Sequence, residues 1–311
     1  MTTEAITPLR QRMIEDMTAR KLGKHSQRSH IYSCKRFAAF LKRSPDTATA
    51  DDVRRFQVQL AESGTSIQNR NRIMTGVRFL FRVTLRRLDL VAEIYHIREP
   101  EKLALVMSAD EIKRLLAMAS SLKTRVLLSL GYGCGLRAGE IVRLKVKHID
   151  RAQCIIRIEQ GKGGKDRNVM LSDELLGLLR QWWKARRGYD THLLPVQERF
   201  LFPGRKAGSP MTTRQLSRLF QETAEAAGIK KGVTLHTLRH SFATHLLEDD
   251  THIRTLQALL GHAKLETTAR YAHVATGMIA KVESPLDRLS RPKRKTPKKA
   301  HKSHQEDQPP A

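Results

Sequence analysis

The stretch CIIRIEQGKGGKDRNVML, residues 154–171, holds the one convincing pair of strands in the sequence. Residues 154–159 and 167–171 are rich in β-forming side chains, and the segment between them is rich in glycine and carries lysines at its tip. Two such runs joined by a glycine-containing turn predict an antiparallel hairpin. Because helical periodicity prevails on both sides of it, the sequence predicts a mainly α fold with a small antiparallel β-sheet.

Helix signals flank the hairpin in both directions. Upstream, Ser108-Ala-Asp-Glu111 is a capping box, in which the first and last side chains bind backbone amides at the start of a helix. Downstream, apolar spacing predicts helices over 173–185, 212–227, 236–248 and 251–260, the last ended by Gly261. The second half of the chain therefore forms a mostly helical domain that opens near Ser108.

The first hundred residues show helical patterns only. Thr49-Ala-Asp-Asp52 is another capping box, and Gly64 would stop the helix that it opens. The most regular helix follows, and its apolar face consists of Ile73, Met74, Val77, Leu80 and Phe81. The sequence therefore predicts an N-terminal domain of four helices.

Arginines line the other sides of this regular helix. Arg72 and Arg82 lie opposite the apolar face, and Arg78 lies on its flank. Such a row is either a solvated surface or a nucleic-acid contact. Because the whole domain is basic, we expect Arg72, Arg78 and Arg82 to bind DNA.

The length of 311 residues fits two domains. We expect an N-terminal helical domain over 1–87, a linker over 88–107, a second domain over 108–284 and a tail over 285–311. The linker region contains Pro100 and lacks clear periodicity. The tail is basic and has the composition of a disordered segment.

Positive charge dominates the chain. Lysines and arginines number 57 against 31 acidic residues, so the net charge is +26. The excess is spread along the chain, with +10 over 1–98, +11 over 99–284 and +5 over the last 27 residues. With 40% hydrophobic residues the chain is too apolar to be a disordered basic tail throughout. The charge indicates a polyanionic partner, and we expect both domains to touch the phosphate backbone of double-stranded DNA.

Several classes of protein are excluded by missing signals. No apolar stretch is long enough to cross a bilayer, and no secretory signal is visible, so we expect no membrane partner and a cytoplasmic, nucleoid-associated location. Neither a P-loop nor a dinucleotide fingerprint in a βαβ context occurs. The histidines do not have the spacing of a metal site; they are His236, His240 and His245. The three cysteines have neither that spacing nor the even number of a disulfide framework; they are Cys34, Cys134 and Cys154.

A compact set of residues remains that suits chemistry on a phosphate. His236 and Arg239 are three residues apart on a helix and face the same way, and His262 and Tyr271 follow in the same basic stretch. Phosphoryl transfer without a metal needs fixed positive charge around the phosphate oxygens, a nucleophile and an acid for the leaving oxygen. Arg239, together with Arg137, could bind phosphate oxygens as planar forks.

The other members of this set supply the reactive groups. His236 and His262 could donate hydrogen bonds or transfer a proton. Tyr271 is a candidate nucleophile whose ordinary pKa near 10 requires cationic surroundings. Lys162, at the hairpin tip, could enter a groove and protonate a leaving hydroxyl.

These segments resemble the tyrosine recombinase (phage-integrase) family, and among its members the Xer-like and mobile-element integrases. The matching motifs are YGCGLRAGE at 132–140, GKGGKDR at 161–167, HTLRHSFATH at 236–245, LLGH at 259–262 and TTARY at 267–271. The resemblance covers residues 108–280 and, more loosely, the N-terminal domain, which would be a SAM-like core-binding domain. Cys134 and Ala138 depart from the residues more common beside the family's first arginine.

The resemblance implies a mechanism. Tyr271 would attack the scissile phosphate and form a 3′-phosphotyrosyl bond, and Lys162 would protonate the departing 5′-oxygen. The phosphate would be held by Arg137, His236, Arg239 and His262. A partner strand's 5′-hydroxyl would then reverse the step, so neither ATP nor a metal cofactor is required. The resemblance also implies that both domains close around a specific recombination site and that a homo-tetramer holds two such sites.

Alternative functions remain open at this point. A type IB topoisomerase uses similar chemistry, but the chain is short for one. A non-catalytic DNA-binding protein would keep the charge but would not need the tyrosine, the lysine and both arginines together. Within the recombinases, integration, excision or transposition of a mobile element competes with Xer-like resolution of chromosome or plasmid dimers, and the basic tail favours the mobile element.

Overall fold

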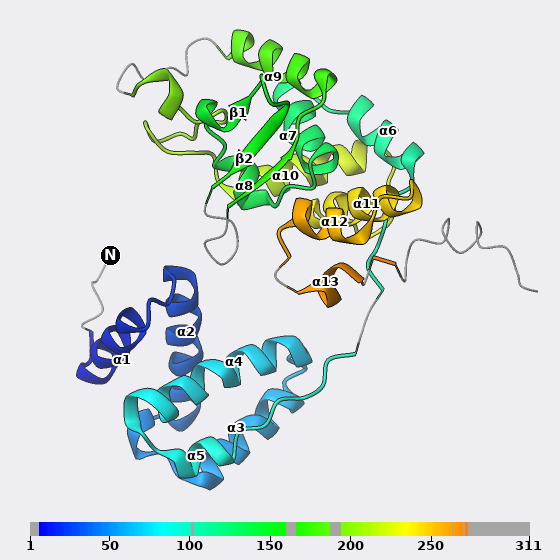
Figure 1. Cartoon of the computed structure of the whole chain (residues 1–311). Coiled ribbons are helices and arrows are strands. Elements are labelled where there is room, and N and C mark those ends of the chain that lie inside the picture. Colours follow the sequence, from blue (N-terminus) through cyan, green and yellow to red (C-terminus); the bar gives the residue numbers. More distant parts are fainter. Residues whose placement is uncertain are drawn as a thin grey trace, which may run out of the picture. The chain divides into compact units, whose positions relative to one another are not determined.

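The computed structural model describes residues 6–100, 103–159, 166–186, 194–262, 264–269 and 271–272. The chain divides into two compact units, Met1–Lys102 and Leu103–Ala311, which are coloured blue to cyan and cyan to orange in Figure 1. Both units consist mainly of helices, and a small antiparallel sheet lies in the second. This architecture confirms the predicted fold class.

The first unit contains five α-helices in its described residues. They are α1 (Pro8–Ala19), α2 (Lys24–Leu41), α3 (Ala50–Glu62), α4 (Ile67–Phe79), which continues as a π-helical segment over Leu80–Leu85, and α5 (Leu88–Ala92). The predicted capping box at the start of α3 is present, with the Thr49 hydroxyl accepting from the Asp52 amide and the Asp52 carboxylate accepting from the Thr49 amide. Phe37 (α2), Phe56 (α3) and Phe81 lie in ring contact at the centre of the core.

Helices α2 and α4 approach each other closely because Gly76 has no side chain. A Cβ atom built on Gly76 would lie 2.5 Å from Ser33 Cβ and 3.1 Å from His30 Cα. Ser33 is buried at this crossing, and its hydroxyl donates to the Ser29 carbonyl in its own helix. The crossing therefore depends on a small residue on each helix.

Two side-chain amides hold the segment after α5 against α3 and α4. On α3, Gln57 Nε2 donates to the Glu93 carbonyl at 2.9 Å and its Oε1 accepts from the Tyr95 amide at 3.3 Å. On α4, Asn71 Nδ2 donates to the Ile97 carbonyl at 2.8 Å and its Oδ1 accepts from the Ile97 amide at 2.9 Å. The chain up to Ile97 therefore belongs to the first unit.

The segment between the units is shorter than the linker expected over 88–107. Its first residues form α5, and Leu90 and Ile94 are buried in the core of the first unit. Its last residue, Met107, is fully buried in the second unit, where its amide donates to the Ser241 hydroxyl at 2.9 Å. The sequence did not reveal α5 because five residues are too few to show a helical period.

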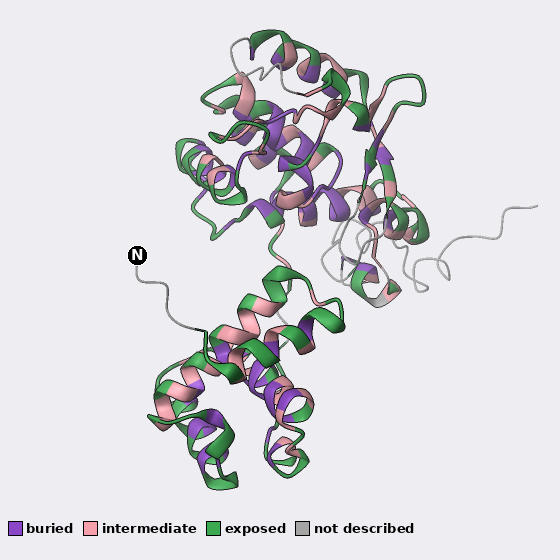
Figure 2. Cartoon of the chain, turned by 90° about the vertical axis from the view of Figure 1, so that its left-hand side faces the viewer, coloured by how far each residue is buried: buried purple, intermediate pink, exposed green. Residues whose placement is uncertain are grey.

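The second unit is packed around the helix α7 (Leu122–Gly133). Its α-helices are α6 (Ala109–Ala117), α7 (Leu122–Gly133), α8 (Ala138–Val142), α9 (Asp173–Ala185), α10 (Thr213–Ala226), α11 (Leu235–Glu248), α12 (Ile253–Leu260) and α13 (Leu265–Ala269). Helix α7 packs against α9, α10 and α11, and Leu127, Leu128 and Leu130 on it are fully buried. Figure 2 shows the buried residues gathered inside each unit. None of the described helices is long and apolar enough to cross a membrane.

The sheet contains three antiparallel strands in the order β1 (Ile149–Asp150), β2 (Ile155–Ile158) and β3 (Arg167–Met170). In the pairing of β2 with β3, Ile156 faces Val169 and Ile158 faces Arg167. The predicted hairpin is confirmed, whereas β1 is an addition whose two residues gave no signal. The helices predicted over 173–185, 212–227, 236–248 and 251–260 correspond to α9, α10, α11 and α12, and Gly261 ends α12 with φ +63°.

The close crossing of α2 and α4 gives a test of the fold. We expect Gly76→Ala to destabilise the first unit by about 1–3 kcal/mol, because the new methyl group must push the two helices apart. Gly177→Ala on α9 makes the same chemical change where nothing lies within 4 Å, so it should stabilise the chain by up to about 1 kcal/mol. Urea unfolding followed by circular dichroism measures both. If Gly76→Ala had the same free energy of unfolding as the wild type, the close packing of α2 against α4 would be contradicted.

Candidate active site

Arg239 occupies the centre of the candidate site, on the first half of α11. Its side chain is 1% exposed, and two of its nitrogens donate to backbone carbonyls, Nη1 to Gly135 and Nη2 to Leu260, each at 2.6 Å. Burial lowers the pKa of Arg239 to about 10, with a further contribution from the charge of Arg137. The guanidinium therefore stays positive at neutral pH and ties α11 to two loops.

The first of these loops presents Arg137. Gly135 has φ +59°, and a Cβ atom on it would lie 2.5 Å from Phe242 Cδ1, so the loop passes tightly over α11. Arg137 follows as the N-cap residue of α8, and its side chain is 24% exposed. It is the more accessible of the two predicted phosphate-binding arginines.

Glu140 on α8 is a buried carboxylate shared by two arginines. Its oxygens accept from Arg137 Nη1 and the Arg137 amide, both at 2.9 Å, and from Arg167 Nη1 and Nη2 at 2.9 and 2.8 Å. Burial alone would raise the pKa of Glu140, but the hydrogen bonds and charges of the two arginines outweigh it and lower the pKa to about 2. The carboxylate is therefore ionised and fixes the orientation of Arg137.

The second loop presents His262, just after α12. Its Nε2 lies 3.2 Å from Arg239 Nη2 and its Nδ1 lies 2.9 Å from the Thr268 hydroxyl. Because arginine can only donate, Nε2 must accept, which places the ring proton on Nδ1. Burial, and then the charges of Arg239, Arg137 and Arg167, lower the pKa of His262 to about 4. This histidine is neutral at physiological pH.

Tyr271 lies between two histidine rings. The ring of His262 stacks on it at a centroid distance of 6.1 Å and an interplanar angle of 15°, and the ring of His240 contacts it at 5.4 Å. Tyr271 is only 3% exposed, and burial raises its pKa, although the charges of Arg239 and Arg137 oppose the rise. The phenol thus lies near the arginines in a covered position, and its role as the nucleophile remains a prediction.

His236 and His240 share one face of α11. Their ring centroids are 4.5 Å apart in an edge-to-face arrangement, and His236 is the exposed member of the pair. Burial, and then the charges of His236 and Arg239, lower the pKa of His240 to about 4. The His240 ring therefore contacts both the His236 ring and the Tyr271 ring.

The remaining predicted residues are Lys162 and the three arginines of the first unit. Lys162 is outside the described residues, which stop at 159 and resume at 166. In the first unit Arg72 and Arg82 are exposed, and Arg72 donates to Asn69 Oδ1 at 2.7 Å. Arg78 is half-buried and donates to the Ile94 carbonyl, so part of its donor capacity holds the segment after α5. DNA binding by these three arginines remains a prediction.

Sequence reasoning assigned no role to Glu140, Arg167 or Thr268. The first two stand inside motifs that resemble the family, but they are 27 residues apart and only the fold shows that they pair. Among the described residues no group of three histidine, cysteine or acidic side chains is arranged to hold a metal ion.

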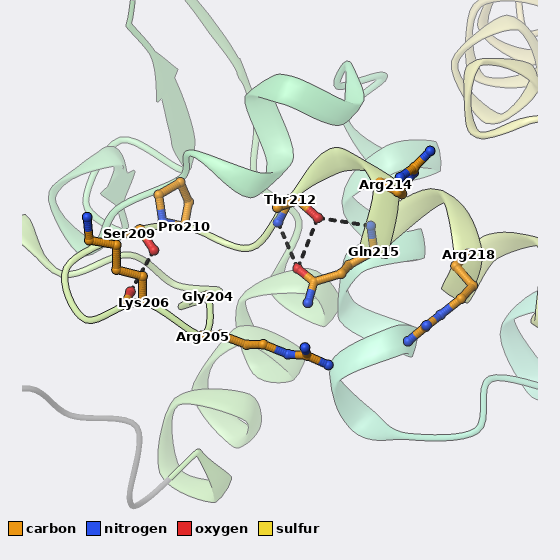
Figure 3. A pocket seen from close by; sticks show the side chains of 9 residues that line it. All are labelled: Gly204, Arg205, Lys206, Ser209, Pro210, Thr212, Arg214, Gln215 and Arg218. Carbon is orange, nitrogen blue, oxygen red and sulfur yellow. Dashed lines mark hydrogen bonds between the residues drawn. The ribbon is translucent and has the colours of Figure 1, made fainter. Parts of the chain in front are cut away.

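A second basic feature lies at the start of α10. A hollow of about 510 Å³ lies between the loop at 204–210 and the first turns of the helix, and four cationic side chains line it: Arg205, Lys206, Arg214 and Arg218. Figure 3 shows Arg205 extending from the loop and Arg218 from the helix at its rim. The Thr212 hydroxyl accepts from the Gln215 amide and Gln215 Oε1 accepts from the Thr212 amide, which fixes the helix start. The hollow has the charge and shape to bind phosphate groups.

Comparison with known proteins places these motifs in a family. Residues 106–278 match the phage integrase family, and residues 9–88 match the phage integrase N-terminal SAM-like domain. The chain belongs to the phage integrase family. It is therefore a tyrosine-type site-specific DNA recombinase, which confirms the resemblance and the enzyme class.

Similar proteins extend over most of the chain. A Sinorhizobium fredii protein provisionally named integrase/recombinase is 39% identical over 289 residues, which cover 92% of this chain and 91% of the relative. The tyrosine recombinase XerA of Pyrococcus horikoshii is 34% identical over 229 residues, 73% of this chain and 77% of XerA. Among solved structures, XerH bound to its palindromic difH substrate has a TM-score of 0.66 at 23% identity and covers 90% of this chain and 85% of its own.

The buried Glu140 gives a test of the site's electrostatics. Its folded pKa of about 2 lies below the ordinary value of 4.5, so the carboxylate adds stability above pH 4.5 that is lost as the pH falls toward 2. We expect Glu140→Gln to cost about 3 kcal/mol at pH 7, and the gap to the wild type to narrow as the pH is lowered from 4.5 to 3. Denaturant unfolding at several pH values measures it.

A surface carboxylate provides the control for this measurement. Asp89→Asn removes the partner of Arg87 in an exposed pair, so its effect should be much smaller at every pH. If the gap between Glu140→Gln and the wild type stayed constant from pH 7 to 3, the carboxylate would not be held ionised as described.

Proposed function

We propose that this recombinase cleaves and rejoins DNA strands through a covalent bond between Tyr271 and the 3′-phosphate. The observation that carries the proposal is the convergence of Arg239, His262 and Tyr271 from three separate segments on one point beside Arg137. In the reaction, the phenol gives up its proton to solvent, its oxygen bonds to phosphorus, the bond from phosphorus to the 5′-oxygen breaks, and the 5′-oxygen takes up a proton, so that no net proton is gained or lost. A 5′-hydroxyl of a partner strand reverses the same exchange.

Arg137 and Arg239 carry the charge stabilisation in this proposal. Negative charge grows on the phosphate oxygens as the phosphorane forms, and fixed guanidinium groups stabilise it without reorganisation. Arg137 is partly exposed and oriented by Glu140, and Arg239 is held from two carbonyls. The family resemblance adds three roles to this proposal: His236 and His262 as phosphate contacts, the latter after it exchanges its present partners Arg239 and Thr268, and Lys162 as the acid for the 5′-oxygen.

The covered position of Tyr271 implies a resting state. At 3% exposure its phenol cannot meet a DNA phosphate, so the segment that carries it must shift before attack. Arg239 Nε is buried and has no hydrogen-bond partner among the described residues, so a phosphate oxygen that enters the site gains a donor there. We propose that DNA binding exchanges the phenol for the phosphate beside Arg239.

The substrate is double-stranded DNA that carries a specific recombination site. Net charges of +10 over residues 1–98 and +11 over residues 99–284 support DNA contacts from both units. XerH, which has the same fold, is bound to a palindromic DNA substrate. We propose that the first unit binds the core of the site, that Arg72 and Arg82 take part, and that four protomers assemble on two sites.

We propose that the biological role is integration, excision or transposition of a mobile element. The S. fredii relative named integrase/recombinase aligns over 92% of this chain, which favours that role. The second candidate role is Xer-like dimer resolution, and the 34% identity to XerA favours it. Inverted repeats or an attachment site beside the gene would decide for the mobile element.

The hollow at the start of α10 provides a further phosphate contact in this proposal. Its four cations lie in the same unit as the site, and its lining includes none of the residues proposed for the chemistry. We propose that they neutralise phosphates of the duplex away from the cleaved bond. Their contribution is then to affinity and not to the rate of the chemical step.

The central test concerns the covalent intermediate. We expect wild-type protein, given a suicide substrate with its own site in EDTA, to form a DNA adduct that survives denaturing electrophoresis. Tyr271→Phe keeps the ring and its packing but lacks the attacking oxygen, so it should bind DNA and form no adduct. Tyr132→Phe removes another phenol of the same unit, one that contacts His245, and should form the adduct normally. An adduct that requires magnesium, or that persists in Tyr271→Phe, would disprove the mechanism.

The hollow gives a separate binding test. We expect Arg214→Ala and Arg218→Ala each to weaken DNA binding and to lower the salt dependence of log Kd by about one phosphate equivalent. The rate of adduct formation at saturating protein should not change. Arg180→Ala, an exposed arginine on α9, is the matched control and should leave the salt slope unaltered. An unchanged slope in the two hollow variants would show that they touch no phosphate.

A further inference from the structure

Arg167, the first residue of β3, is a buried cation outside the predicted catalytic set. Its side chain is 8% exposed, and a charge so far from water requires partners for its donors. Two nitrogens, Nη1 and Nη2, donate to the two oxygens of Glu140 at 2.9 and 2.8 Å. The third, Nε, donates to the Leu259 carbonyl at 2.8 Å. Each of the three nitrogens therefore has a partner within the protein.

The turn after α12 is shaped around this side chain. Gly261 has φ +63°, and a Cβ atom on it would lie 2.8 Å from Arg167 Cδ. The Leu259 carbonyl, which accepts from Arg167, belongs to the last turn of α12, and Gly261 directly follows that helix and leads into His262. Arg167 thus has two sets of contacts. One is with the segment that presents His262, and the other is with Glu140, the carboxylate that orients Arg137.

The charges of this cluster explain why a second arginine is needed. Glu140 bound to Arg137 alone would cancel the positive charge that the phosphate must meet. With Arg167 added, one buried carboxylate faces two guanidinium groups, and the cluster keeps a net positive charge. Arg137, at 24% exposure, is the member of the cluster that can present that charge outward.

We infer that Arg167 is a positioning residue for strand cleavage, which sets Arg137 through Glu140 and His262 through the turn after α12. The inference rests on the proposed function of the site. Arg167 acts through its partners and not on the DNA, because its side chain is buried at 8% exposure. It joins the β2–β3 hairpin, α8 and α12, and these are the elements next to the proposed lysine, arginine and histidine of the chemistry.

The test uses the full-length chain and single-turnover adduct formation at saturating protein. Arg167→Ala leaves Glu140 short of a partner and risks unfolding, so Arg167→Lys, which keeps the buried charge but loses the fork, is the second variant. We expect Arg167→Lys to bind DNA within about threefold of wild type and to form adduct about 100-fold more slowly, because small displacements of positioned groups cost about that much. Thermal unfolding is recorded beside each rate.

A double variant separates positioning from an independent or merely structural role. Arg137→Lys removes the fork of Arg137 on Glu140, so the part of the Arg167→Lys loss that passes through Arg137 is already present in it. The Arg137→Lys/Arg167→Lys double variant should therefore be slower than wild type by clearly less than the product of the two single losses. Multiplied losses would show that Arg167 acts independently of Arg137 and would overturn the inference. A weakening of DNA binding in proportion to the loss of rate would overturn it as well.

Arg157 supplies the matched control. It lies on β2 of the same hairpin, is 52% exposed and pairs with Asp150 at 2.7 Å. Arg157→Lys should form adduct at the wild-type rate. If the wild type forms no adduct, the proposed function fails. If the wild type forms adduct and Arg167→Lys is as fast, only the role of Arg167 is disproved.

Discussion

The buried guanidinium of Arg239 connects the reactive groups of this protein to its fold. Its bonds to the carbonyls of Gly135 and Leu260 hold the loop after α7 and the end of α12 at fixed positions on α11. A buried charge is tolerated only where its donors are satisfied, so neither loop can move without a large energetic cost. Arg137 follows the first of these carbonyls and His262 the second. The geometry of the site is thus a consequence of how the core accommodates one cation.

The site keeps its positive charge through arginines and holds its inner histidines neutral. The pKa values of His240 and His262 are both lowered to about 4, chiefly by burial. The charge that faces a phosphate therefore stays constant across the neutral range, since arginine does not titrate there. Neutral imidazoles remain able to accept or pass a proton next to a tyrosine whose own pKa is raised by burial. The arginines thus carry a charge that does not change with pH in this range, and the inner histidines carry none.

The sequence predicted those parts of the fold and of the site that have local signals. The hairpin, both capping boxes and the long helices follow from patterns within about fifteen residues, and the structure contains them. Pairing between distant residues left no such signal, which is why the contact of Arg167 with Glu140 was missed. The hydrogen bond from Arg78 to the Ile94 carbonyl was also missed, because it forms only when the segment after α5 packs back against α4. Burial of Tyr271 is likewise a property of the packed unit and of no motif.

Asn71 and Gln57 hold the chain as far as Ile97, and Met107 is already part of the second core. Nine residues are then left between the two anchored ends, and a fully extended chain of that length spans at most about 35 Å. Under the proposed binding of both units to one duplex, so short a tether would give the second unit a millimolar effective concentration once the first has bound, provided that their two contact sites fall within that reach. The side-chain amides that fasten residues 93–97 would thereby set the avidity of the whole protein for DNA.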